Sequence, residues 1–161
     1  MNIRVATIDD LQEIIEVYNY AREFMAKTGN PHQWADGHPK KELLLSDFPL
    51  KRLYALEDEV GIAGVFMFDT NPDPTYSYIE DGEWPNDEPY GVIHRIASFG
   101  RAKGVLKSAV EFAKQKTSNI RIDTHEDNIV MQNALAKLGF KRCGIIYLEN
   151  GDPRIAYQLV V

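Results

Sequence analysis

The sequence of 161 residues lacks the features of secreted and membrane proteins. Its one cysteine, Cys143, cannot form an intramolecular disulfide, which favours a reducing compartment. The longest apolar run, residues 60–68, is about half the length that a membrane helix requires. No long apolar stretch follows the single basic residue near the start, which argues against a secretory signal. We therefore expect a cytoplasmic protein with no membrane partner.

Several common catalytic and cofactor motifs are also missing. There is no G-x-x-x-x-G-K-[ST] loop and no G-x-G-x-x-G after a strand, which excludes a Walker-type loop and a dinucleotide fingerprint. No G-x-S-x-G elbow occurs, and the four histidines lack the spacing of zinc ligands, so we expect no metal. A net charge of −6 without a basic aromatic surface motif counts against nucleic-acid binding.

Charge is distributed unevenly along the chain. Residues 53–94 contain ten acidic residues and no lysine or arginine, whereas residues 95–142 contain ten basic and four acidic residues. Such a division is typical of two solvated faces. It is equally compatible with an acidic loop that faces a basic site and attracts a cationic ligand.

The hydrophobic pattern predicts one α/β domain, residues 1–161, with helices on the faces of a mixed sheet. The expected order is β-α-α-β-β-β-α-β-α-β-β. Strands are predicted at residues 3–6, 53–56, 60–68, 92–98, 120–124, 143–148 and 154–159, and helices at 11–25, 39–47, 105–116 and 128–138. Residues 69–89 form a long loop with four of the eight prolines and seven acidic residues, and loops of this length are usually functional or mobile.

The sharpest local feature is a glycine-bearing turn, residues 99–104, between a predicted strand and helix. Such a turn can leave backbone N–H groups convergent at a helix N-terminus, where they bind phosphate oxygens. Arg101, Lys103 and Lys107 would add full charges. The glycines could also serve the backbone alone, and a single glycine turn does not decide between the two.

Two segments resemble the GNAT superfamily of N-acetyltransferases. Residues 101–106 match its R/Q-x-x-G-x-G/A segment except at Leu106, where the family has a small residue. Residues 128–140 echo its N-x-x-A-x-x-L-Y-x-K-x-G-F segment. The resemblance spans nearly the whole chain and implies the GNAT fold with acetyl-CoA as cosubstrate. The implied coenzyme-binding residues lie on the fourth strand, the glycine turn and the last helix: Ile96, Ala97, Ser98, Arg101, Ala102, Lys103, Gly104, Val105, Leu106, Asn128, Gln132 and Asn133.

The resemblance also implies an activity, which is acetyl transfer from acetyl-CoA to a primary amine of a small molecule or peptide by direct attack in a ternary complex. The alternative is a non-catalytic CoA- or acyl-CoA-binding module. Leu135 favours this alternative, because many members place there a tyrosine that protonates the departing thiolate. Gln132, Asn133 and Tyr147 could replace it, or solvent could. A homodimer is compatible with the resemblance, since closing strands in this family often pair between subunits.

Acetyl transfer to an amine requires a base, and a group that titrates near neutrality serves best. His94 shares strand parity with Ile96 and Ser98, so we expect the three on one face. Some GNAT enzymes use a histidine at this position, although a strand histidine can equally be hydrogen-bonded within the sheet. The loop carboxylates Glu80, Asp81 and Glu83 are rival bases, though most loop carboxylates are simply solvated.

Acceptor-binding residues are expected on two loops. Gln33 and Trp34 lie where the family's first helices line the acceptor pocket, and Tyr78 and Trp84 belong to the long acidic loop. Trp34 could instead cover the edge of the core. The remaining aromatic residues at helical spacing are expected in the core: Tyr18, Phe24 and Phe112.

Overall fold

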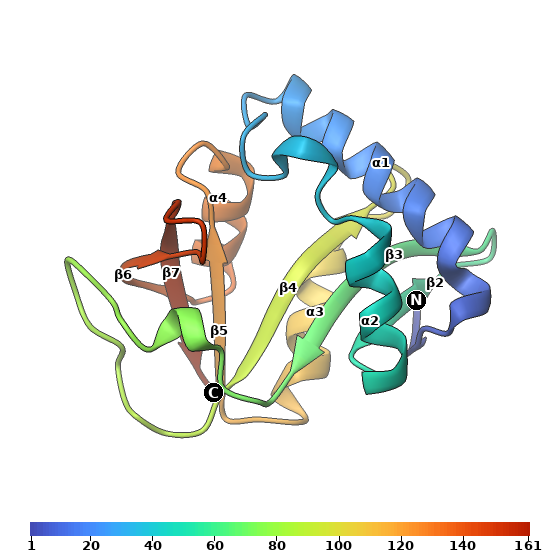
Figure 1. Cartoon of the computed structure of the whole chain (residues 1–161). Helices are drawn as coiled ribbons and strands as arrows, with labels where there is room; N and C mark the ends of the chain where they lie inside the picture. The colour runs from blue at the N-terminus through green and yellow to red at the C-terminus, as the bar shows by residue number, and fades with distance from the viewer.

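A computed structural model describes all residues, 1–161, and shows a seven-stranded sheet with helices on both faces (Figure 1). The order across the sheet is β1-β2-β3-β4-β5-β7-β6, and only β4 and β5 are parallel. The strands are β1 (Asn2–Val5), β2 (Leu53–Glu57), β3 (Ile62–Asp69), β4 (Gly91–Ser98), β5 (Asn119–Thr124), β6 (Lys141–Tyr147) and β7 (Pro153–Val160). The helices are α1 (Leu11–Lys27), α2 (Lys41–Leu50), α3 (Val105–Lys114) and α4 (Ile129–Lys137). The mixed α/β fold and the predicted order of elements are confirmed.

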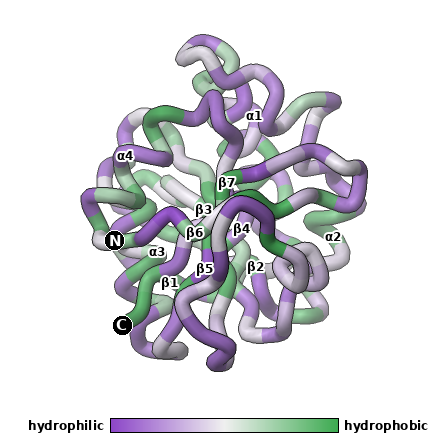
Figure 2. The backbone as a smooth tube through the Cα atoms, turned by 90° about the vertical axis from the view of Figure 1, so that its left-hand side faces the viewer, coloured by the Kyte–Doolittle hydropathy of each residue, from purple (hydrophilic) through white to green (hydrophobic).

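One hydrophobic core lies on each face of the sheet. α1 buries Ile14, Val17 and Tyr18 at helical spacing against one face, where α2 adds Leu44. α3 packs on the other face with α4, and its contribution consists of small and β-branched residues: Val105, Ala109, Val110 and Ala113. None of the helices has the length and apolar character needed to cross a membrane. Hydrophilic segments predominate in the loops around the periphery (Figure 2).

β4 and β5 separate soon after they meet. They pair only at Gly91–Ile120 and Val92–Arg121, and beyond these pairs the two strands diverge (Figure 1). From Ile93 onward the edge of β4 that faces β5 therefore has no strand partner. Unpaired backbone groups of this kind require other hydrogen-bond partners, which gives this edge a capacity to bind an extended molecule.

A bulge in β4 changes which face its side chains reach. Arg95 has a left-handed φ of 51°, and β4 carries one extra residue between the Val65–Ala97 and Met67–His94 pairs. Val92 and Ala97 consequently pack in the same core although their parity differs, and Ile96 packs on the opposite face. The prediction that His94, Ile96 and Ser98 share one face is wrong, because the bulge reverses the alternation.

Two contacts hold this bulge in place. The hydroxyl of Tyr18 donates to the backbone carbonyl of Arg95 at 2.7 Å. The Arg95 guanidinium pairs with the fully buried carboxylate of Asp47, which also accepts from Arg52 at 2.7 Å. These contacts come from α1 and α2, so an unfavourable backbone conformation is fixed by two helices.

The long acidic loop packs against the sheet. A 3₁₀ turn, Pro74–Tyr76, lies at its start, and Glu80 forms a β-bridge with Ile145 of β6. Further along, Arg121 of β5 is buried between the rings of Trp84 and Tyr90, with its Cζ 3.9 and 4.0 Å from the two ring centroids. Stacking of a guanidinium on two aromatic rings stabilises such an arrangement without a carboxylate partner.

Candidate active site

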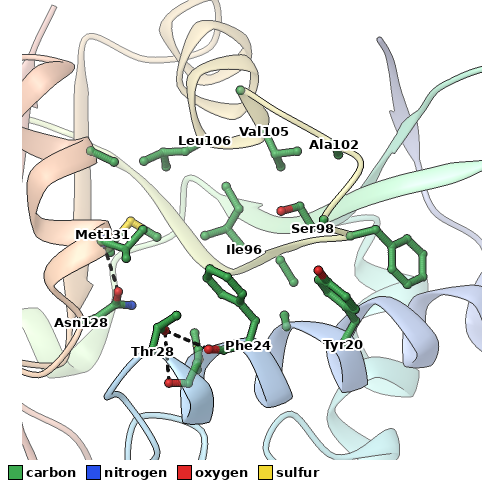
Figure 3. Close-up of a pocket in the computed structure, with 18 residues that line it drawn as sticks. Tyr20, Phe24, Thr28, Ile96, Ser98, Ala102, Val105, Leu106, Asn128 and Met131 are labelled. Atoms are coloured by element: carbon green, nitrogen blue, oxygen red, sulfur yellow. Dashed lines mark hydrogen bonds between the residues drawn. The ribbon is translucent and has the colours of Figure 1, made fainter.

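The first part of the site is a cavity of about 360 Å³ where β4 leaves β5, which we call the β4 cleft. Side chains of α1, β4, α4 and the start of α3 converge on it (Figure 3). Its walls are largely apolar. The predicted coenzyme residues that line it are Ile96, Ala97, Ser98, Ala102, Gly104, Val105, Leu106 and Asn128, whereas Arg101, Lys103, Gln132 and Asn133 do not.

The glycine turn leaves the start of α3 open. Gly104 precedes the helix with a left-handed φ of 73°, and no side chain caps the first turn. The first N–H groups of α3 are therefore available at the cleft, where the helix dipole adds partial positive charge. Together these features give the β4 cleft an anion-binding end.

The Arg101 side chain is directed away from this end. It donates to Oδ2 of Asp58 at 2.9 Å and to the carbonyl of Ile62 at 3.1 Å, both in the β2–β3 hairpin. The hydrogen bond from Arg101, with backbone N–H groups, lowers the pKa of Asp58 to about 2. The half-buried carboxylate of Asp58 thus pairs with the Arg101 guanidinium, which the sequence pattern assigned to a coenzyme contact.

α4 supplies small and apolar groups to the β4 cleft. Met131 and Ala134 line it, whereas Leu135 is fully buried in the core. Gln132 instead donates to the carbonyls of His125 and Glu126, and Asn133 is exposed. No hydroxyl group of α4 therefore faces the cleft.

A second, smaller cavity of about 280 Å³ continues from the β4 cleft, and we call it the histidine cavity. The two share Met25, Ile96 and Met131 as lining residues, so they are contiguous at the middle of β4. The histidine cavity differs in character, because charged side chains line it: Asp73, His94, Arg95, Asp123, Glu149 and Arg154.

His94 lies between two carboxylates in this cavity. Its Nε2 is 2.7 Å from Oδ2 of Asp73, and its Nδ1 is 3.7 Å from Oδ2 of Asp123. An ionised carboxylate only accepts hydrogen bonds, so Nε2 carries the proton of the first contact. The second distance is too long for a hydrogen bond. In the neutral imidazole, Nδ1 is therefore the open acceptor.

Neighbouring groups fix both carboxylates. Burial raises the pKa of Asp73, but hydrogen bonds from His94 and Thr75 outweigh it and hold the pKa at about 2. Asp123 accepts from the hydroxyl of Tyr76 at 2.6 Å. Burial, and then the charge of Asp123, raises the pKa of Tyr76 well above its ordinary value. The arrangement is a histidine ring held between two carboxylates that other side chains fix in place.

Of the four residues predicted to bind the acceptor, two line the histidine cavity and two lie elsewhere. Gln33 and Trp34 line the histidine cavity, although Oε1 of Gln33 already accepts from Asn128 at 2.9 Å. Trp34 is also buried in the core against Tyr18, so both of its predicted roles are compatible with its position.

Other predicted residues lie away from both cavities. Tyr78 stacks on Tyr147 at the surface, and Trp84 stacks on Arg121. Glu80 accepts from the hydroxyl of Tyr147, while Asp81 and Glu83 are not among the lining residues of either cavity. The core assignment of Phe24 is wrong, because it is 48% exposed and lines the β4 cleft.

Three lining residues of the histidine cavity were not identified from the sequence: Asp73, Asp123 and Arg154. Neither was Tyr76, which donates to Asp123. Asp73 belongs to the acidic loop. The composition of residues 69–89 therefore indicated the right segment, but the carboxylates chosen in it were Glu80, Asp81 and Glu83. Asp123 stands at the end of a predicted strand, next to the strand of His94 in the sheet. That position was a usable signal, since residues at the ends of neighbouring strands are brought together.

Comparisons with known proteins agree with this geometry. No protein-family model matches the sequence, and no curated protein matches it. Several solved structures are similar to it. An acetyltransferase of the GNAT family from Streptococcus agalactiae 2603 is similar with a TM-score of 0.89 and 28% identity, over 99% of this chain and 95% of that chain. A candidate acetyltransferase from Staphylococcus aureus MU50 has a TM-score of 0.71 and 25% identity, over 99% of each chain.

A GNAT-family acetyltransferase from Listeria monocytogenes 4b F2365 shares the fold, with a TM-score of 0.73 and 22% identity over 99% of this chain and 94% of that chain. The likenesses span nearly the whole chain, and the β4 cleft lies within the shared fold. The chain therefore has the GNAT fold and resembles GNAT-family acetyltransferases over nearly its whole length, which supports an acyltransferase.

Proposed function

We propose that this acyltransferase moves the acetyl group of acetyl-CoA to the primary amine of a small molecule or peptide, by direct attack in a ternary complex. The observation that carries the proposal is the contiguity of the two cavities at Ile96. An acetyl donor in the β4 cleft and an amine beside His94 would meet at that residue, and such positioning accounts for much of the catalysis of a two-substrate reaction.

The residues of the β4 cleft fit acetyl-CoA. The unpaired edge of β4 at Ile96–Ser98 offers backbone groups to the amides of an extended pantetheine chain, and the apolar walls match its methylenes. The uncapped start of α3 offers N–H groups to a pyrophosphate. Acetyl-CoA supplies the thioester that is consumed. N–H groups of β4 near the bulge would polarise its carbonyl.

The reaction balances as follows. An ammonium group first loses one proton; the amine nitrogen then forms a bond to the carbonyl carbon, and the carbon–sulfur bond breaks. The nitrogen loses a second proton on becoming an amide, and the thiolate takes up one. The products are the N-acetylated amine, CoA with a free thiol, and one proton released to solvent.

We assign His94 as the general base that accepts the proton lost by the ammonium group before attack. Nδ1 is the open ring nitrogen, and the resulting imidazolium would lie between Asp73 and Asp123. Because those carboxylates are already in place, they stabilise the charge without rearrangement. Glu80 and Glu83 lie outside the cavity and would require a different loop conformation to serve as the base.

We assign protonation of the thiolate to solvent. The side chains of α4 at the cleft are those of Val130, Met131 and Ala134, and none of them can donate a proton. The hydroxyl of Tyr147 is engaged by Glu80 outside both cavities. A CoA thiolate has a low enough basicity for water to serve here.

The test is a thiol-release assay with acetyl-CoA across a panel of primary amines, run with the wild type, His94→Gln and the matched control His32→Gln. His32 is a surface histidine with a side chain 73% exposed. We expect His94→Gln to lower kcat by about 100-fold or more, the usual contribution of a general base, and His32→Gln to have no effect.

Two outcomes would overturn parts of this proposal. Unchanged turnover in His94→Gln would remove His94 as the base and direct attention to the loop carboxylates. Tight CoA binding by the wild type with no thiol release on any amine would instead support a protein that binds the coenzyme without transferring its acyl group.

A further inference from the structure

Arg154 stands out in the histidine cavity because it has no negatively charged partner. It lies on β7 and is 6% exposed. Its guanidinium donates only to backbone carbonyls, those of Pro153 at 2.8 Å and Gln33 at 3.3 Å. Burial lowers the pKa of Arg154, and the charges of Asp123 and Asp152 oppose that effect. A buried cation that lines a cavity with donors to spare is typical of an anion-binding group.

The other well-buried arginines are accounted for within the fold. Arg95 lines the same cavity, and its charge is paired with Asp47, which fixes the β4 bulge, although its buried Nε has no hydrogen-bond partner. Arg121 lies between two aromatic rings and donates to the side chain of Gln158 and the carbonyl of Asn86. Neither needs a ligand to satisfy its charge. The charge of Arg154 has no partner within the fold, and a bound anion would neutralise it.

The position of Arg154 relative to Asp123 sets a distance between two opposite charges. Asp123 of β5 pairs with Ala156 of β7, two residues from Arg154, so the two charged side chains are diagonal neighbours on one face. The backbones of such diagonal neighbours are about 7–8 Å apart. They make no ion pair, and His94 faces the same space as Asp123. A molecule with a cation at one end and an anion at the other could bridge this gap.

We propose that the acceptor is a small zwitterion, a free amino acid whose amine lies at His94 and Asp123 and whose carboxylate is bound by Arg154. This inference rests on the proposed acetyl transfer and names its substrate class. A cavity of about 280 Å³ is at the lower limit for ligand sites, which favours a single small molecule over a peptide. A peptide N-terminus would also present a neutral amide to Arg154, leaving its charge uncompensated.

The local potential supports the same orientation. His38 also lines the cavity, and its pKa is lowered by burial and then by the positive charges of Arg95, Arg22 and Arg154. The carboxylates Asp73 and Asp123 flank His94 instead. A zwitterion would therefore enter with its amine toward the acetyl donor in the β4 cleft, which is the orientation that transfer requires.

The first experiment compares acceptors on the wild type. Thiol release is measured for the twenty standard amino acids and, for each that reacts, for its α-carboxamide. We expect kcat/KM to fall about 10- to 150-fold on replacing the carboxylate by the amide, the range for losing a hydrogen-bonded charge. Equal acetylation of acid and amide, or acetylation of peptide N-termini in preference to free amino acids, would overturn the proposal.

The second experiment compares Arg154→Gln and Arg154→Lys with Arg142→Gln, a change at an exposed arginine on β6. We expect Arg154→Gln to erase the preference for acid over amide, Arg154→Lys to retain part of it, and Arg142→Gln to keep it in full. The KM for acetyl-CoA should stay the same in all three. An unchanged acid-to-amide ratio in Arg154→Gln would contradict the proposal. If Arg154→Gln does not fold, the acid-to-amide ratios of Arg154→Lys and of the wild type still test the proposal.

Failure of this inference and failure of acetyl transfer give different results. If no amine of any kind is acetylated, the proposed function fails. Calorimetry then measures binding of the same amino acids and amides in the presence of CoA, and selective binding of the acids would still support the Arg154 site. If simple amines are acetylated while amino acids are not, acetyl transfer stands and the zwitterion is excluded.

Discussion

The β4 cleft and the histidine cavity meet at Ile96, but the chemical groups that line them differ. The cleft is walled by apolar side chains and offers polar contacts through backbone groups of β4 and the start of α3. The histidine cavity is lined by acidic and basic side chains from β4, β5, β7 and the acidic loop. A ligand bound through backbone groups can be held by many different sequences. A ligand bound in a charged cavity depends on the identity of each charged side chain.

This contrast assigns binding of the shared cosubstrate to the fold and selection of the acceptor to individual residues. It predicts that changes in one cavity leave the other's ligand unaffected. Variants that alter one cavity test that separation through the ligand of the other.

Filling the β4 cleft should give the largest effect. Ala134→Phe places a ring in the cleft, and we expect the affinity for acetyl-CoA to fall by about 100-fold or more, because an overfilled cavity costs a few kcal/mol. Titration calorimetry measures this loss. Ala136→Phe, on the exposed face of the same helix, is the matched control and should bind normally. Equal losses in both variants would show damage to α4 instead of occupation of the cleft.

Neutralising Asp123 should act on the acceptor side alone. Asp123→Asn keeps an oxygen for the hydroxyl of Tyr76 but removes the charge that faces Nδ1 of His94. We expect kcat/KM for the amine to fall about 10- to 150-fold, the range for a lost contact to a charged group. Steady-state kinetics with each substrate varied in turn checks this. A parallel rise in the KM for acetyl-CoA would break the separation of the two cavities.

Removing the Arg121 guanidinium should loosen the loop that carries Asp73. Arg121→Met leaves the hydrogen-bond acceptors Gln158 and Asn86 without a donor, which costs about 1–3 kcal/mol of unfolding free energy. Urea denaturation measures this loss, and Arg142→Met is the exposed control. Because Asp73 orients His94, kcat should fall while the affinity for acetyl-CoA holds. A variant as stable as the wild type would show that the stacking does not anchor the loop.

The smallest effect concerns pH. The pKa of Asp73 is about 2 in the fold against an ordinary value of 3.8, so its ionised form stabilises the native state. That contribution is fully present above about pH 5 and is lost as the pH falls through 3.8 toward 2. Wild type and Asp73→Asn should therefore differ in unfolding free energy by about 1–2 kcal/mol at pH 6 and progressively less at pH 4 and 3. A difference that grows on acidification would contradict the assignment.

The turn and helix starts that border the β4 cleft followed from the sequence because they depend on local features. The element order is confirmed, and the glycine turn and Asn128 could be located because caps and turns require particular residues at fixed spacing. The acceptor half could not be derived in the same way. An arginine in a left-handed conformation at position 95 reverses the face of β4, and alternation alone does not reveal it.

Long-range contacts explain the other omissions. Asp73, Asp123 and Arg154 are separated by 31 or more residues along the chain, and they meet only because β7 inserts beside β5 and the acidic loop folds over the sheet. Composition identified that loop as acidic and aromatic. It could not distinguish Glu80, which binds Tyr147 at the surface, from Asp73, which binds His94.

The most direct test of the separation between the two cavities is the affinity of His94→Gln for acetyl-CoA, measured by titration calorimetry beside its turnover. The account predicts a Kd within about twofold of the wild type, together with a kcat lowered by about 100-fold or more. A Kd weakened in proportion to the loss of turnover would contradict it, because His94 would then be holding the acetyl donor instead of receiving the amine's proton.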